Sequence, residues 1–221
     1  MIFTLAFTLT LIAHVLARVL QKKYPRFPLV VTALVLVLLF VWLLPLSFDD
    51  YYSSTERVFE HLLGYVTVAL AIPLAFMSFE GIPYRKLTRL LLLSTLIGVL
   101  LPVGLAALIG LGADAQLAFV TRAVTTPIAL NIAEIINAPL ALASLIIVIS
   151  GLLGAAAVPW LLKDVTDDRA KGLAMGLVAH AIGTAEAWQI SSICGRYSAF
   201  GMAINGLLTA LWAPWVFAYF Y

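Results

Sequence analysis

The stretch AQLAFVTRAVTTPIALNIAEIIN, residues 115–137, is the least lipid-like of the candidate membrane segments in a strongly apolar chain. It carries Arg122, Glu134, three threonines and two asparagines among apolar side chains. The way this stretch is accommodated decides the direction of every later helix, so the fold prediction begins with it.

The composition around that stretch indicates an integral membrane protein. Of the 221 residues, 63% are hydrophobic and 11% are charged, whereas soluble domains are about half apolar and a quarter charged. A helix needs roughly 17–25 apolar residues to span a bilayer. Runs of this kind occur at 2–17, 28–46, 58–77, 90–112, 139–162, 172–194 and 198–219. We therefore predict an all-α polytopic membrane protein with about seven transmembrane helices in the lipid bilayer.

Basic residues gather in three loops, around 18–26, 85–89 and 163–171. Because cytoplasmic loops collect Lys and Arg, all three loops are expected inside, which puts the N-terminus outside and the C-terminus in the cytoplasm. A full crossing by 115–137 would place the third basic loop outside. We therefore expect 115–137 to enter from outside and return, as a re-entrant or broken segment.

In that topology the three spans before the polar stretch run opposite to the three spans after it. This is the pattern of a 3+3 inverted repeat with discontinuous helices, which is common in secondary transporters. The sequence holds no P-loop, G-x-S-x-G, H-E-x-x-H or dinucleotide fingerprint, so no enzyme and no cofactor are expected. The single cysteine, Cys194, excludes a multi-cysteine metal site, and a net charge of +2 gives no sign of nucleic-acid binding.

The polar stretch contains a predicted helix start at Thr125-Thr126-Pro127. Threonine is a good N-cap and proline is favoured in the first turn, so we predict a helix that opens at Pro127, is capped by Thr126 and runs toward Glu134. A helix N-terminus attracts anions, which makes this start a candidate binding site. The alternative is a proline kink braced by threonine hydroxyls.

A second break is predicted in AHAIGTAEAW, residues 179–188. Gly183 is expected to end one helix and Thr184 to cap the next, with His180 just before the break. Ionisable residues inside a membrane are candidates for function, so His180 is expected to bind substrate or carry a proton. The alternative is a histidine satisfied by a carbonyl of a neighbouring helix. Glu134 and Glu186 either carry protons or form ion pairs with Arg122 or Arg196.

Three stretches, VTTPIALNIAEIINAPLALASLIIVISGLLGAAAVPWLL, RAKGLAMGLVAHAIGTAEA and AFGMAINGLLTALWAP, resemble the LrgB/CidB family of bacterial membrane proteins. The resemblance covers essentially residues 28–218 and makes 1–221 a single LrgB-like transmembrane domain. Its motifs T-T-P-I-A and H-x-[IL]-G-T imply a substrate site. The residues at the matching positions are Thr125, Thr126, Pro127, His180, Gly183 and Thr184.

The resemblance also implies a function and a location. Family members are holin-like regulators of murein hydrolases, plastid relatives exchange glycolate and glycerate, and bacterial members are linked to pyruvate uptake. We therefore expect a proton-coupled or exchanging transporter of small monocarboxylates, lactate included, in the bacterial inner membrane. A homodimer is expected. The alternative is a holin-like protein that regulates murein hydrolase activity and autolysis with an LrgA/CidA-type partner.

The chain departs from the family pattern at two positions of the second motif. Ala179 stands where relatives often have serine, and Glu186 stands where they often have arginine. Because Arg196 follows nearby, we expect Glu186 and Arg196 to form a charge-reversed pair.

Overall fold

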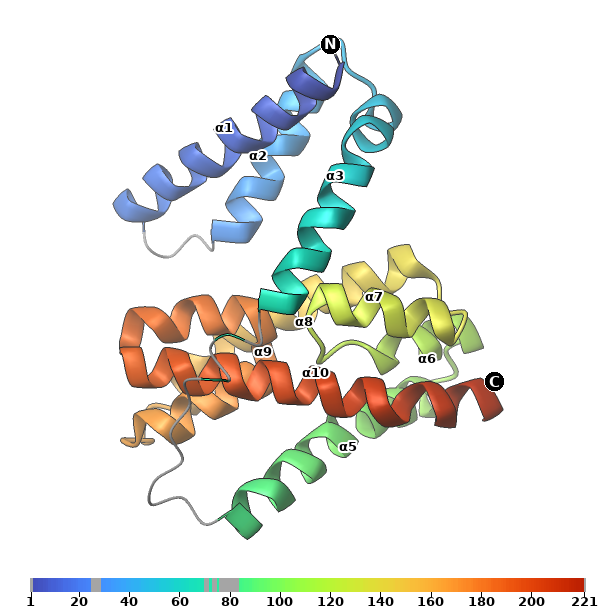
Figure 1. The fold of residues 1–221 in the computed structure, drawn as a ribbon, viewed down its shortest axis with the longest axis vertical. Coiled ribbons are helices and arrows are strands. Elements are labelled where there is room, and N and C mark those ends of the chain that lie inside the picture. The colour runs from blue at the N-terminus through green and yellow to red at the C-terminus, as the bar shows by residue number, and fades with distance from the viewer. Residues whose placement is uncertain (1, 25–28, 70–71, 73–74, 76–83, 221) are drawn as a thin grey trace. The chain divides into compact units, whose positions relative to one another are not determined.

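The computed structural model describes residues 2–24, 29–69, 72, 75 and 84–220 (Figure 1). These residues are mostly helical and contain no strand. The helices are α1 (Ile2–Lys23), α2 (Leu29–Leu43), α3 (Phe48–Ala69), α5 (Tyr84–Leu108), α6 (Ala113–Val120), α7 (Thr126–Ile135), α8 (Leu140–Leu161), α9 (Asp168–Ile190) and α10 (Ser192–Phe220). The chain divides into two compact units, Met1–Tyr65 and Val66–Tyr221, and each is described by itself.

The N-terminal unit is built on α1 and α2, which pack against each other. Three fully buried alanines on α1 allow a close approach of neighbouring backbones; they are Ala6, Ala13 and Ala17. A hydrogen bond of 2.8 Å between the Thr10 and Tyr51 hydroxyls ties α1 to the first turn of α3. Apolar contact and one polar link therefore hold this unit together.

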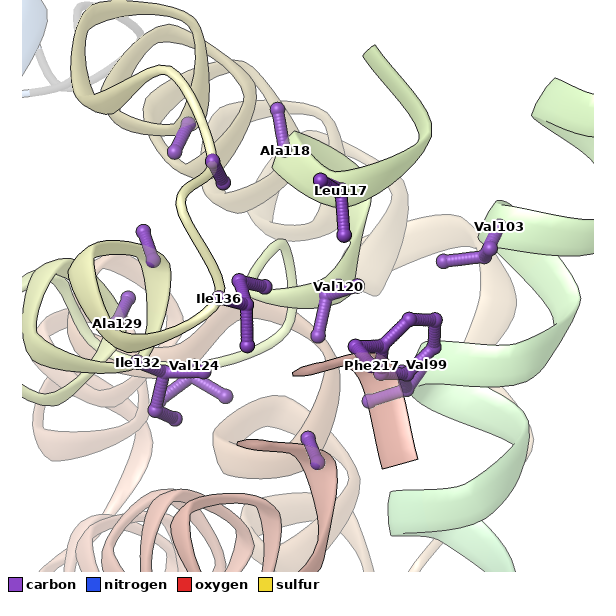
Figure 2. Close-up of a cluster of buried hydrophobic side chains, with 14 of the residues drawn as sticks. Val99, Val103, Leu117, Ala118, Val120, Val124, Ala129, Ile132, Ile136 and Phe217 are labelled. Carbon is purple, nitrogen blue, oxygen red and sulfur yellow. The ribbon is translucent and has the colours of Figure 1, made fainter. Parts of the chain in front are cut away.

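In the C-terminal unit, α5 and α10 run in the same direction. Toward the start of both helices, Leu91 packs with Phe200. Toward their ends, Val99 and Phe217 belong to one buried cluster and lie side by side (Figure 2). The prediction that the last span runs opposite to 90–112 is therefore wrong. The prediction placed both the 85–89 loop and the C-terminus in the cytoplasm. Because α5 and α10 are parallel, the start of α5 and the end of α10 lie on opposite sides, so the two cannot both be cytoplasmic.

The cause of this error is α9, which is a helical hairpin rather than a span. In a continuous helix Asp168 and Ser191 would be about 34 Å apart, but their side chains share a hydrogen bond of 2.6 Å. The reversal occurs at His180, whose φ of 38° and ψ of −123° are non-helical. The arms 168–179 and 181–190 are about 18 and 15 Å long, too short to cross a bilayer core of about 30 Å. The predicted span 172–194 is therefore wrong.

The polar stretch also forms a hairpin, as the sequence predicted. The turn between α6 and α7 lies beside the middle of α10, because the Asn205 side chain donates to the Ala123 carbonyl at 2.7 Å. The end of α7 lies further along α10, where Ile135 lines a cavity with Pro214 and Tyr219. Helix α6 begins next to the end of α5, and α7 ends toward the end of α10, which is parallel to α5. The hairpin therefore begins and ends on the same side of the unit. We call 113–135 hairpin 1 and 168–190 hairpin 2.

Local sequence explains where the chain turns into and out of hairpin 1. Gly110 adopts a φ of 77°, and the next amide, of Leu111, donates back to the Ala106 carbonyl at 2.9 Å. Asn137 adopts a φ of 55° after α7. These left-handed residues end helices in the way that glycine and asparagine favour.

Four of the predicted spans coincide with helices that are long and apolar enough to cross a membrane. These helices cover Ile2–Lys23, Tyr84–Leu108, Leu140–Val158 and Ser192–Tyr219 within the described ranges. The predicted span 28–46 corresponds to a shorter apolar helix, Val31–Leu43, and 58–77 lies partly outside the described residues. The protein is thus an all-helical membrane protein.

Candidate functional site

The turn of hairpin 1, residues 121–125, is buried almost completely. Thr121 and Val124 have no exposed surface, and Thr125 is 5% exposed. The helix that follows begins one residue earlier than predicted, because Thr125 is the N-cap and Thr126 already belongs to α7. The Thr125 cap works through its backbone, whose carbonyl accepts from the amides of Ile128 and Ala129 at 3.0 and 2.9 Å.

Asn205, which the sequence prediction did not single out, holds this turn in place. Its side-chain amide donates to the Ala123 carbonyl at 2.7 Å, and its side-chain oxygen accepts from the Thr95 hydroxyl at 2.9 Å. Asn205 is 3% exposed. One asparagine therefore satisfies a turn carbonyl that would otherwise be buried without a partner, and links α5, hairpin 1 and α10.

The turn of hairpin 2 consists of one residue, His180, which is 3% exposed. Its imidazole Nε2 lies 3.2 Å from the Ile147 carbonyl oxygen on α8. A carbonyl oxygen only accepts, so Nε2 carries the hydrogen. In a neutral ring the lone pair is then on Nδ1, which remains able to accept a hydrogen bond or a proton. The imidazole fits closely against α8, because a Cβ added at Gly151 would lie 2.5 Å from its ring.

Gly183 and Thr184 do not start the second arm, which corrects the predicted position of the break. The helical break is at His180, three residues earlier. Gly183 is where the two arms touch, since a Cβ there would meet the Met175 carbonyl at 2.7 Å. The Thr184 hydroxyl does not cap a helix but hydrogen bonds with the Ser198 hydroxyl of α10 at 2.8 Å.

The two hairpin turns share neighbours in the middle of the unit. Ile147 accepts the His180 hydrogen bond and packs in the same buried cluster as Val120 and Val124 of hairpin 1. The Arg122 Nε is buried without a hydrogen-bond partner among the described residues. The turn of hairpin 1 thus holds a buried guanidinium nitrogen with free hydrogen-bonding capacity, and the turn of hairpin 2 holds a buried imidazole.

The ion pairs predicted among four charged residues are absent from the described part of the chain, where the only salt bridge joins Arg169 and Asp167. Glu134 is exposed near the end of α7, most of a ten-residue helix away from Arg122. Arg196 is also exposed, and its Nε donates to the Ser192 carbonyl of its own helix at 3.2 Å. Glu186 instead lines a cavity that Arg196 does not reach. The prediction that Glu186 and Arg196 form a charge-reversed pair is therefore wrong.

Polar contacts of Asp167 and Arg169 cap the start of hairpin 2. Asp167 caps the helix by accepting from the Arg169 amide at 2.9 Å. The Arg169 side chain also donates to Asp167, and this hydrogen bond holds the pKa of the carboxyl below its usual value. Asp167 is therefore ionised at neutral pH, as an N-cap carboxylate should be.

Two residues that position the hairpins were missed from sequence, although a signal was present. Ser198 and Asn205 are buried polar residues in an apolar helix and lie seven positions apart, which places them on one helix face. Ser198 contacts hairpin 2 and Asn205 contacts hairpin 1. That periodicity marks the face of α10 that both hairpins pack against.

No group of three or more His, Cys, Asp or Glu side chains in the described part of the chain is arranged to hold a metal ion. The buried polar groups at the two hairpin turns include one guanidinium, one imidazole and the hydroxyls of Thr121 and Thr125. These are groups that bind anions and hydroxylated solutes.

Comparison with known proteins supplies the family. Residues 10–219 match the LrgB-like family. The chain is 29% identical to an uncharacterised Bacillus subtilis protein, YwbG, over 96% of both chains. It is 28% identical to the holin-like protein CidB of Staphylococcus aureus, over 96% of this chain and 95% of that one. No solved structure matches. The chain belongs to the LrgB-like family.

Proposed function

We propose that this chain is a holin-like membrane protein that regulates murein hydrolase activity and autolysis, together with an LrgA/CidA-type partner. The observation that carries this proposal is the match over residues 10–219 to a family whose relatives include holin-like CidB proteins. The four long apolar helices support it, because a holin-like protein acts from within the membrane. The proposed activity is not that of an enzyme.

A second candidate, a secondary transporter of small organic anions such as glycolate, glycerate, pyruvate or lactate, is favoured by one further observation. The two hairpins have the same length. Their starts, Ala113 and Asp168, are 55 residues apart, and so are their ends, Ile135 and Ile190. Helix α5 precedes hairpin 1 and α8 precedes hairpin 2, with opposite directions. We infer an inverted repeat of 84–135 and 140–190, which differs in its boundaries from the predicted 3+3 repeat. Paired broken segments of this kind line substrate sites in transporters.

In the transporter candidate, the polar groups at the two hairpin turns have distinct roles. Arg122 supplies a positive charge for a carboxylate, and the starts of the helices after Thr125 and His180 add backbone N–H groups. The free Nδ1 of His180 accepts a proton or a substrate hydroxyl. Glu134 and Glu186 are the remaining candidates for proton coupling, and Thr126, Pro127, Gly183 and Thr184 shape the surrounding backbone.

Flux into proteoliposomes separates the two candidates. A carrier takes up labelled lactate, pyruvate or glycolate saturably when a pH step is imposed, and retains sucrose. A holin-like lesion releases sucrose and a small anion at similar rates, without saturation. Purification with and without the LrgA-type partner then tests whether permeability depends on the partner.

His180→Ala sharpens this comparison. Because the imidazole forms the buried turn of hairpin 2 against α8, we expect the variant to lose saturable anion uptake by about a hundredfold, a loss of about 2.7 kcal/mol, while expression and elution remain normal. His61→Ala is the matched control, since His61 is exposed and, among the described residues, its ring hydrogen bonds to the Arg57 carbonyl of its own helix at 2.6 Å. Non-saturable leakage that is the same in the wild type and both variants would exclude the carrier and favour the holin-like protein.

A further inference from the structure

A cavity of about 360 Å³ lies between the last turn of α8 and both arms of hairpin 2. Lys163 at the end of α8, Lys171 in the first arm, and Glu186 and Gln189 in the second arm supply its polar groups. Lys163 and Gln189 are exposed, so the cavity opens at the surface. It is separate from the hairpin turns, and Glu186 is the one residue it shares with the transporter candidate above.

The lysines of this cavity are not neutralised within the protein. Among the described residues the only ion pair is the one between Arg169 and Asp167, so neither lysine is in a salt bridge. Glu186 lines the same cavity but does not approach either ammonium group within salt-bridge distance. Two positive charges and one negative charge therefore face the cavity, and their sum is +1.

The rest of the cavity wall is apolar and runs from the buried core to the lipid-facing surface, because Met175 is 1% and Val158 8% exposed. Val158 and Leu162 of α8 and Met175 and Ile190 of hairpin 2 form this wall. Its surroundings are exposed apolar side chains, with Trp160 73% and Ile190 47% exposed. Tryptophan is typical of the membrane interface. A soluble anion would leave this wall uncovered, whereas an amphiphile covers the wall and meets the lysines.

We propose that this cavity binds an anionic phospholipid, with Lys163 and Lys171 on the phosphodiester and an acyl chain along the apolar wall. Basic pockets between membrane helices are known to bind anionic lipid head groups. A phosphatidylglycerol carries one negative charge, which matches the net +1 of the cavity. Its two glycerol hydroxyls donate hydrogen bonds to the Glu186 carboxylate and to the Gln189 side-chain oxygen. A choline head group has no such donors.

Native mass spectrometry of the full-length protein in detergent tests this site, with phosphatidylglycerol and phosphatidylcholine of the same acyl chains as probes. We expect the wild type to retain phosphatidylglycerol in preference to phosphatidylcholine. The double variant Lys163→Gln/Lys171→Gln should bind phosphatidylglycerol about thirtyfold more weakly, because each of the two lysines near an anionic lipid contributes on the order of 1 kcal/mol. Both side chains lie at the edge of the fold, so the variant should elute normally.

The matched control is Lys22→Gln/Lys23→Gln, which removes the same charge from exposed positions at the end of α1. It should keep the wild-type preference, and an equal loss in this control would show general charge attraction and overturn the proposal. A second arm adds inorganic phosphate at millimolar concentration. Displacement of the lipid by phosphate alone would assign the cavity to a soluble anion, and equal retention of both lipids would also contradict the site.

Discussion

Single residues set how closely the hairpins pack. Gly176 lies where the first arm of hairpin 2 crosses α10, and a Cβ added there would collide with the Ser198 carbonyl. Gly172 meets the Cys194 carbonyl in the same way, one turn earlier. Since close backbone approach between membrane helices requires small residues, these two glycines allow α9 and α10 to form the most extensive contact in the unit.

Gly176→Ala should therefore destabilise the protein by about 1–3 kcal/mol, the usual cost of an added methyl group in a packed interior. Gly104→Ala is the control, because a Cβ there meets nothing within 4 Å, and it should leave stability unchanged. Thermal unfolding in detergent measures both. Equal melting temperatures for the two variants would contradict the close contact between α9 and α10.

At the scale of elements, the hairpins depend on α10 for partners of their buried polar groups. Asn205 bonds to the turn of hairpin 1 and to α5, while Ser198 bonds to the second arm of hairpin 2. A buried polar group without a partner costs about 1–3 kcal/mol. The apolar contacts of α10 hold the hairpins against it, but these hydrogen bonds determine the position of their turns.

Asn205→Leu should loosen the turn of hairpin 1, because it leaves the Ala123 carbonyl and the Thr95 hydroxyl buried without partners. We expect a destabilisation of about 2–4 kcal/mol and faster amide hydrogen exchange in 121–125. Thr209→Val is a matched control on the same helix, since the Thr209 hydroxyl bonds only to the Asn205 backbone carbonyl, at 2.7 Å. Unchanged exchange at 121–125 in Asn205→Leu would rule out this positioning role.

At the scale of the C-terminal unit, two re-entrant hairpins change the topology that hydropathy predicts. Because neither hairpin crosses, the helices among the described residues of 84–220 that pass through the unit are α5, α8 and α10, and α5 and α10 are parallel. The loop at Gly110 and the end of α10 therefore lie on one side, and the loop at Asp164 lies on the other.

Single cysteines in a Cys194→Ser background test this topology. Gly110→Cys and Tyr219→Cys should react with a membrane-impermeant maleimide from the same side of the membrane, and Asp164→Cys from the opposite side. Intact cells and inverted vesicles provide the two sides. Labelling of Tyr219→Cys together with Asp164→Cys would instead restore α9 as a full span and exclude hairpin 2.

The sequence predicted hairpin 1 because that stretch is polar and because the basic loops restrict the number of crossings. It predicted no hairpin at 172–194, because the length of this mostly apolar run led to its interpretation as a full span with an internal break. It did locate the break in the right motif, with His180, Gly183 and Thr184 all in the second arm or its turn. The structure moved the break to His180 and gave Gly183 and Thr184 packing and hydrogen-bonding roles.

By itself, then, the amino-acid sequence determined the membrane environment, the helical class, the family and the two segments where helices are interrupted. These follow from composition and from short motifs, which act locally along the chain. Only the tertiary structure decided that the second interruption reverses the chain, that α5 and α10 are parallel, and that Ser198 and Asn205 hold the hairpins. The physical reason is that one residue with a positive φ redirects a helix without changing its hydropathy, and the partners that hold that reversal are distant in sequence.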